Sequence, residues 1–230
     1  MFQFILCVFC IKSANISSNQ CNNQFIDDYE NKKKNNGKKS LNHLLTDACG
    51  DSLTYSIEGE KLIIFGYGKM SNYEFYSTNN KAPWHDNRLN IKNIQLPEGI
   101  TYIGIDAFKD FKNLESITIP ENVTLIGSNA FQYCSSLKSF TFPSKLSYIS
   151  DYILDECWSL TSINFLCSVT SIQSGAFSDC KSLESIIIPE SVISIGTGIF
   201  SGCISLSTVA FPKNVEEIGS GTFSGCQNLT

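Results

Sequence analysis

Two kinds of side chain in this sequence could carry chemistry, namely the two histidines and the ten cysteines. His85 precedes Asp86 in the sequence PWHDN, and an imidazole beside a carboxylate is a pairing used for proton transfer. Adjacent residues of an extended chain point to opposite faces, however, and no nucleophile accompanies this pair in a motif. We therefore expect His85 to pack and form hydrogen bonds in a cap, and we expect no catalytic residues, no cofactor and no small-molecule substrate.

The cysteines could form disulfides or hold a metal ion. Five of them recur at an interval of 23 residues: Cys134, Cys157, Cys180, Cys203 and Cys226. Phe111 takes the same position in another unit, so this is a packing position, and we expect buried free thiols there. Zinc is not expected, because the CxxC spacing occurs only at Cys7–Cys10, inside an apolar segment. Pairing is left open for Cys21, Cys49 and Cys167.

The interval of 23 residues organises most of the chain. Prolines keep it at Pro97, Pro120, Pro143, Pro189 and Pro212. Leucines keep it at Leu114, Leu137, Leu160, Leu183, Leu206 and Leu229. Six units follow one another without insertion over residues 91–228, and a fixed period of this length indicates a solenoid.

Each unit is expected to contain two extended pieces and one turn. In the second unit, Ile117–Ile119 alternates β-branched residues in and out and ends at Pro120, which predicts a short strand. Val123–Ile126 predicts a second extended piece, and the following SNAFQYC segment has the apolar spacing of one helical or 3₁₀ turn. One buried column is expected from Phe131, Phe177, Phe200 and Phe223.

The repeated pattern LxxIxIPxxVxxIGxxAFxxC resembles the BspA-like leucine-rich repeat family (surface antigen BspA-like). The segments CGDSLTYSIEGEKLIIFGYGKM and APWHDNRLNIKNIQLPEGI resemble the cap that often opens such arrays. In the cap, alternation over Leu53–Ile57, a turn at Glu58–Glu60 and a return over Leu62–Phe65 predict a hairpin. The expected fold is thus a mainly β leucine-rich-repeat solenoid, right-handed and open, with short strands, single helical turns and a β-hairpin N-terminal cap.

The chain divides into segments of different composition. We expect a signal peptide at 1–14, a disordered polar linker at 15–48, the cap at 49–90, the six repeats at 91–228 and the start of a truncated seventh repeat at 229–230. An accidental apolar N-terminus is the alternative to the signal peptide. A nuclear signal or a contact with an anionic surface is the alternative for the lysines at 32–34 and 38–39.

The charge of the array argues against nucleic acid as a partner. The net charge is −5, and residues 91–228 hold 13 acidic residues against 7 lysines and no arginine. Binding to a phosphate backbone requires clustered cations, which the array lacks. The apolar start is too short to span a bilayer, so we expect membrane attachment only through an anchor not present in this chain.

A candidate binding face follows from the outward positions of the first strand in each unit. These positions carry small, uncharged side chains: Asn93, Gln95, Ser116, Thr118, Ser139, Thr141, Ser162, Asn164, Ser185 and Thr208. A solvent-facing sheet surface without a partner is the alternative. Tyr102 and Tyr148 are candidate exposed anchors for a partner. N-glycosylation sequons begin at Asn15, Asn122 and Asn228.

The resemblance implies a cell-surface or secreted protein that mediates protein binding or adhesion through the solenoid face. Its partner would be a protein or another cell-surface ligand, such as the extracellular matrix. The alternative is an intracellular scaffold or regulatory protein-interaction module, which would place the chain in the cytoplasm.

Overall fold

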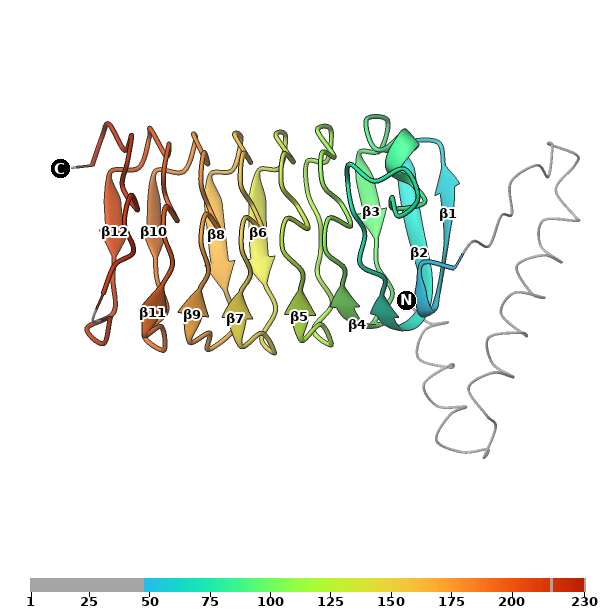
Figure 1. The fold of residues 1–230 in the computed structure, drawn as a ribbon, viewed down its shortest axis with the longest axis horizontal. Helices are drawn as coiled ribbons and strands as arrows, with labels where there is room; N and C mark the ends of the chain where they lie inside the picture. The colour runs from blue at the N-terminus through green and yellow to red at the C-terminus, as the bar shows by residue number, and fades with distance from the viewer. Residues whose placement is uncertain (1–47, 216, 230) are drawn as a thin grey trace, which may run out of the picture. The chain divides into compact units, whose positions relative to one another are not determined.

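The computed structural model describes residues 48–215 and 217–229, within a compact unit that spans Leu45–Thr230. The described residues do not include the expected signal peptide or the polar linker up to residue 47. Cys7, Cys10, Asn15 and Cys21 lie in these segments. Successive coils of the chain lie side by side in a row (Figure 1). Short strands dominate and helix is almost absent from the described part, which confirms the predicted mainly β solenoid.

The solenoid opens with the predicted hairpin, formed by β1 (Gly50–Glu58) and β2 (Lys61–Met70). Strand β2 continues beyond the predicted end and pairs in parallel with two later strands. Its first residues pair with β3 (Asn93–Gln95), and its last residues pair with β4 (Gly99–Ile103). One strand of the cap therefore starts both rows of strands in the solenoid.

The two rows continue through the array with the register of the repeat. The first row continues as β6 (Ser139–Phe142), β8 (Ser162–Phe165), β10 (Ser185–Ile187) and β12 (Thr208–Ala210). The second row continues as β5 (Leu125–Ile126), β7 (Tyr148–Ile149), β9 (Ser171–Ile172) and β11 (Ser194–Ile195). Paired residues are 23 apart, as in Ser139 beside Ser162.

The predicted strand at Ile117–Ile119 is wrong in one respect. Its side chains alternate in exposure as expected, but the backbone forms only a single bridge, between Asn93 and Ser116. Alternation of exposure requires only an extended backbone, whereas a strand also requires a paired neighbour.

The segments expected as helical turns are runs of hydrogen-bonded turns. The Phe131 N–H donates to the Ile153 carbonyl oxygen of the next coil at 3.1 Å. The N–H groups of Asn129 and Tyr133, two residues to either side, likewise donate to carbonyl oxygens of the next coil. The intervening N–H groups form local bonds, such as that from Gln132 to the Asn129 carbonyl oxygen at 3.1 Å. A helix cannot extend here, because every second N–H group is used between coils.

Two positions in each of these segments have a positive φ. The first column is Asp106, Asn129, Tyr152, Gly175, Gly198 and Gly221. The second is Asp110, Tyr133, Glu156, Asp179, Gly202 and Gly225. Glycine adopts this conformation without steric cost. At Gly175 a Cβ would also lie 2.3 Å from Cε1 of Tyr152, so any other residue there would displace that ring.

A continuous hydrophobic core runs through the cap and the coils. Phe108 and Phe131 stack with ring centroids 5.5 Å apart, and Phe177 and Phe200 stack at 5.8 Å. The predicted aromatic column is interrupted at Leu154. There, aromatic side chains from the first row of strands fill the space. The buried Phe140 contacts Phe131, the buried Phe142 contacts the half-buried Phe165, and both Phe142 and Phe165 contact Phe177. Phe223 stacks on Phe200 but is only half-buried, unlike the other predicted members.

The cap joins the column through a tryptophan that the sequence analysis did not single out. Trp84 is fully buried and stacks on Phe108 at 5.6 Å, and its Nε1–H donates to the Ala107 carbonyl oxygen at 2.7 Å. The only helix among the described residues, the 3₁₀ helix η1 (His85–Asn87), follows directly. Trp84 thus extends the aromatic column of the coils into the cap.

The cysteine ladder contains free thiols, as expected, and each thiol also forms a hydrogen bond. The Cys134 Sγ donates to the Phe108 carbonyl oxygen at 3.3 Å, and the same bond recurs in the following coils. Phe111 cannot donate in the first coil, and the equivalent carbonyl, that of His85, accepts instead from Nη1 of Arg88 at 2.9 Å. The carbonyl beside this position is therefore paired in each coil, by the thiol itself or, where Phe111 replaces it, by Arg88. Cys226 is the exception in burial, because it is only half-buried.

Replacing Phe177 by alanine tests the aromatic column. Phe177 is fully buried, so Phe177→Ala should lower the free energy of unfolding by about 3–5 kcal/mol through the cavity that it leaves. Urea denaturation measures this loss. Ile187→Ala is the control, because Ile187 is 76% exposed and its loss should cost less than about 0.5 kcal/mol. Equal effects of the two substitutions would contradict the assignment.

The buried thiols predict a loss of stability at alkaline pH. Burial raises the pKa of Cys203 to about 12 and raises that of Cys180 well above its ordinary value near 9. Above pH 9 the unfolded chain loses these protons while the folded chain keeps them, so stability should fall as pH rises, by about 1.4 kcal/mol per pH unit for each such thiol. Urea midpoints at pH 8 and pH 10 measure the slope.

A Cys180→Ala chain provides the control for this slope. Its stability should depend less steeply on pH than that of the unchanged chain, and an identical slope would show that the thiols are not responsible. In the folded chain at pH 8, Cys226 should react with iodoacetamide before the four fully buried thiols of the ladder.

Candidate binding surfaces

The residues predicted as a binding face lie on one exposed surface along the first row of strands, which we call the strand ribbon. All ten of its predicted residues, from Asn93 to Thr208, are exposed, while the residues between them point into the core. Neighbouring members stack in register, as Thr141 does beside Asn164 on β6 and β8. The ribbon can therefore contact a partner through hydroxyl and amide groups over several coils.

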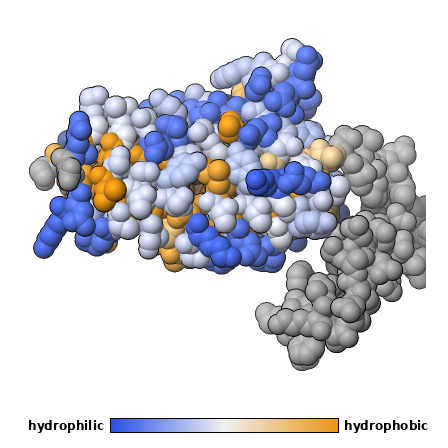
Figure 2. Space-filling model, turned by 60° about the horizontal axis from the view of Figure 1, so that its bottom comes forward, coloured by the Kyte–Doolittle hydropathy of each residue, from blue (hydrophilic) through white to orange (hydrophobic). Residues whose placement is uncertain are grey.

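The strand ribbon changes in character along the solenoid. Near the C-terminal coils it carries exposed aliphatic side chains, since Ile187 is 76% exposed and Leu166 is 59% exposed. Figure 2 shows hydrophobic surface gathered on the coils toward this end, at the left of the view. Leu166 stands where the other five units have proline, so the array is more apolar here than the repeat requires.

Charged residues border the strand ribbon near the cap. Lys92 Nζ lies 2.8 Å from Oε1 of Glu60, and Lys138 Nζ lies 2.7 Å from Oε2 of Glu115. The hydrogen bond from Lys138 lowers the pKa of Glu115, and the hydrogen bond to Glu60 raises the pKa of Lys92. These exposed pairs contribute little stability, but they fix a charged border beside an uncharged surface.

The two predicted anchor tyrosines differ in exposure. Tyr148 is 38% exposed on β7. Tyr102, on β4, is half-buried, and its hydroxyl donates to Oδ1 of Asn72, which also accepts from the Ile105 N–H. The expectation that Tyr102 is an exposed aromatic is wrong, because this hydroxyl joins the cap to the first coil.

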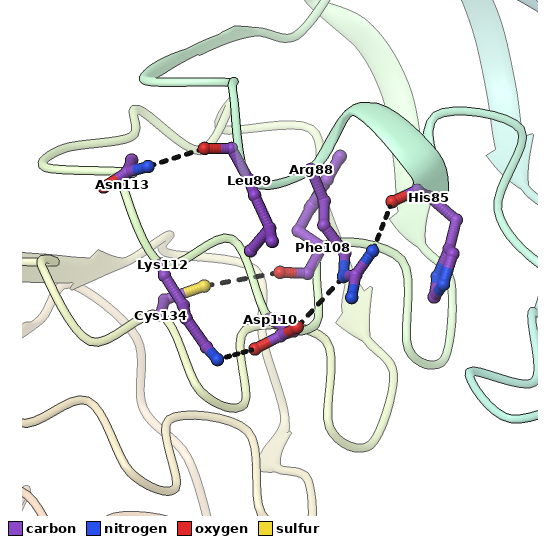
Figure 3. A network of polar contacts seen from close by, with 8 residues as sticks. All are labelled: His85, Arg88, Leu89, Phe108, Asp110, Lys112, Asn113 and Cys134. Carbon is purple, nitrogen blue, oxygen red and sulfur yellow. Dashed lines mark hydrogen bonds and ion pairs between the residues drawn. The ribbon is translucent and has the colours of Figure 1, made fainter.

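His85 lies in a polar network that joins the cap to the first two coils (Figure 3). Nε of Arg88 lies 3.0 Å from Oδ2 of Asp110, and Nζ of Lys112 lies 3.3 Å from Oδ1 of the same carboxylate. The His85 ring contacts Phe75, and burial together with the charge of Arg88 lowers the pKa of His85. Asp86 is exposed, and His85 joins the network through its carbonyl oxygen, which accepts from Nη1 of Arg88.

A second surface feature lies on the turns, and the sequence analysis missed it. This groove, which we call the turn-side groove, has a volume of about 340 Å³ and is lined by Tyr76, Asp110, Lys112, Tyr133, Glu156 and Trp158, with Phe75 beside them. Asp110, Tyr133 and Glu156 come from one positive-φ column, so three successive coils form its floor. A comparison of the columns could have found it, because Trp158 is the one aromatic residue in a column that otherwise holds Lys112, Ser135, Lys181, Ile204 and Gln227.

The remaining predicted sites are resolved in part. Cys49 and Cys167 are free and buried, whereas Cys21 lies outside the described residues. Asn122 is exposed, but its Nδ2 donates to the Glu98 carbonyl oxygen at 2.9 Å. Asn228 is exposed, and residue 230 of its sequon is not described.

Two further types of site were sought among the described residues. No cluster of three or more His, Cys, Asp or Glu side chains with the geometry of a metal site occurs in residues 48–215 and 217–229. The same residues contain no helix that is both long enough and apolar enough to cross a bilayer.

Solved structures similar to this chain are leucine-rich repeat proteins of bacteria. One from Bacteroides ovatus is 29% identical with a TM-score of 0.52, covering 62% of this chain and 42% of that one. One from T. pallidum (TpLRR) is 25% identical with a TM-score of 0.56, and the match covers 77% of this chain and 88% of that one. The pneumococcal vaccine antigen PcpA shares the fold, with 19% identity and a TM-score of 0.52. The match covers 75% of this chain and 51% of that one.

The chain spans less than half of the length of the Bacteroides ovatus protein. No curated protein sequence matches it. The family model described as BspA type leucine rich repeat region (6 copies) matches residues 84–184 and 170–230, which is more than half of the chain. The chain therefore belongs to the BspA-type leucine-rich repeat family.

Proposed function

We propose that this protein binds another protein through the strand ribbon, as a cell-surface or secreted adhesion protein and not as an enzyme. The observation that carries the proposal is the ribbon itself, in which small uncharged side chains are exposed in register from the cap to the last coils. Rigid solenoids commonly bind partners through such extended faces. The extracellular matrix or a host cell surface is the proposed source of the partner.

The free thiols are equally compatible with a second candidate, an intracellular scaffold. Buried cysteines without disulfides suit a reducing compartment as well as an oxidising one. Labelling of an epitope on the intact chain separates the two candidates. Labelling of unpermeabilised cells supports the surface protein, and labelling only after permeabilisation supports the scaffold.

Arginine substitutions in the ribbon test the proposed face. Thr141 and Asn164 are neighbours near its centre, so replacing both by arginine should place two unpaired charges in the contact. Binding of the full chain to immobilised matrix proteins or host cells should weaken by at least about tenfold. Binding by the unchanged chain should change little between low and high salt, because the ribbon carries few charges to screen.

Ser168→Arg is the matched control. Ser168 is exposed between β8 and β9, outside the ribbon, so this chain should bind like the unchanged one. The proposal fails if the control and the double variant lose binding equally, or if binding collapses at high salt.

A further inference from the structure

The turn-side groove is built from aromatic rings that already hold cations of the protein itself. Nζ of Lys109 lies 5.2 Å from the ring centroids of Phe75 and of Tyr76, and 5.7 Å from that of Tyr133. Nζ of Lys181 lies 4.4 Å from the ring centroid of Trp158. These distances are those of cation–π contacts, so the local arrangement suits positive charge.

Part of the aromatic surface in the groove is nevertheless exposed, although Lys181 lies over one side of Trp158. Tyr76 is 81% exposed and Trp158 is 45% exposed. Lys109 is almost fully buried behind the rings and forms an ion pair with Asp106, so it is part of the wall rather than a removable occupant. The volume of about 340 Å³ is sufficient for one long side chain of a partner together with its neighbouring backbone.

The carboxylates of the groove are not equivalent. Asp110 is neutralised by its contacts with Arg88 and Lys112. Glu156 forms no ion pair with any residue in the described part of the chain, although Asp155 and Asp179 on one side and Lys112 and Lys181 on the other act on its charge. The groove therefore presents one unpaired carboxylate two residues from an exposed tryptophan.

We propose that the turn-side groove binds an arginine side chain on an exposed segment of a partner protein. The guanidinium group is planar, stacks on aromatic faces and can donate two parallel hydrogen bonds to one carboxylate. Trp158 and Tyr76 provide the aromatic surface, and Glu156 provides the acceptor. A lysine ammonium matches this combination less well, because it is compact, strongly hydrated and unable to form the bidentate contact.

Tryptophan fluorescence of the full chain measures the binding. The protein has two tryptophans, and Trp84 is fully buried, so the solvent-sensitive signal comes from Trp158. The probe is a glycine peptide with two arginines and blocked termini. It is compared with otherwise identical peptides, the lysine twin and the citrulline twin, in which lysine or uncharged citrulline replaces the arginines. The arginine peptide should change the fluorescence saturably in the millimolar range, the lysine twin should bind several-fold more weakly, and the citrulline twin should not bind.

Two groove variants and two matched controls complete the experiment. Glu156→Gln should weaken arginine-peptide binding by about tenfold, which corresponds to about 1.4 kcal/mol for one charged hydrogen-bonding contact. Glu190→Gln makes the same charge change at an exposed site outside the groove and should have no effect. Trp158→Ala, measured by calorimetry, should also weaken binding, whereas Tyr67→Ala, at an exposed aromatic on β2 outside both surfaces, should not.

Several outcomes would overturn the proposal. Absence of saturable binding would do so, as would equal binding of the citrulline twin. Equal losses in Glu156→Gln and Glu190→Gln would indicate unspecific attraction to an acidic protein, and equal binding of the lysine twin would indicate a general cation site. The Thr141→Arg and Asn164→Arg chain should bind the peptide normally, so failure of the groove and failure of the strand ribbon are distinguishable.

Discussion

Backbone hydrogen bonds between the turn segments of adjacent coils are the interaction on which the rest of this structure depends. The Phe177 N–H donates to the Ile199 carbonyl oxygen at 3.0 Å, and the equivalent N–H of Phe200 donates to Thr222 one repeat later. Such bonds recur only if every coil has the same length, so the period of 23 residues is fixed by them. That fixed length places aromatic rings, thiols and outward strand residues in columns. The two proposed binding surfaces are consequences of this alignment.

The cap is necessary because the same bonds leave carbonyl groups unused at the first coil. A buried carbonyl without a donor costs free energy. The Ile105 carbonyl oxygen accepts from the Tyr73 N–H at 3.0 Å, and that of Ala107 accepts from the Trp84 indole. The cap thus supplies donors and a stacked ring, in addition to covering apolar surface. The network of Arg88 and Asp110 joins the same elements at the surface.

The sequence predicted what depends on period and polarity, namely the solenoid, the hairpin cap, the buried columns and the exposed ribbon positions. It did not reveal the positive-φ columns, because Asp, Asn, Tyr and Glu occupy them in the early coils, where only glycine would signal that conformation. Tyr102 seemed exposed because its partner, Asn72, lies 30 residues earlier. The turn-side groove was missed for a similar reason, since Phe75 and Tyr76 come from the cap and the other lining residues come from three different coils.

Amide hydrogen exchange of the full chain tests the central claim, that bonds between coils fix the repeat. The N–H groups of Phe108, Phe131, Leu154, Phe177 and Phe200 each donate to the next coil. We expect these amides to exchange far more slowly than exposed turn amides of the same coils, such as that of Lys145, because each must wait for coils to separate. Exchange of the five amides at the rate of the exposed ones would contradict the account.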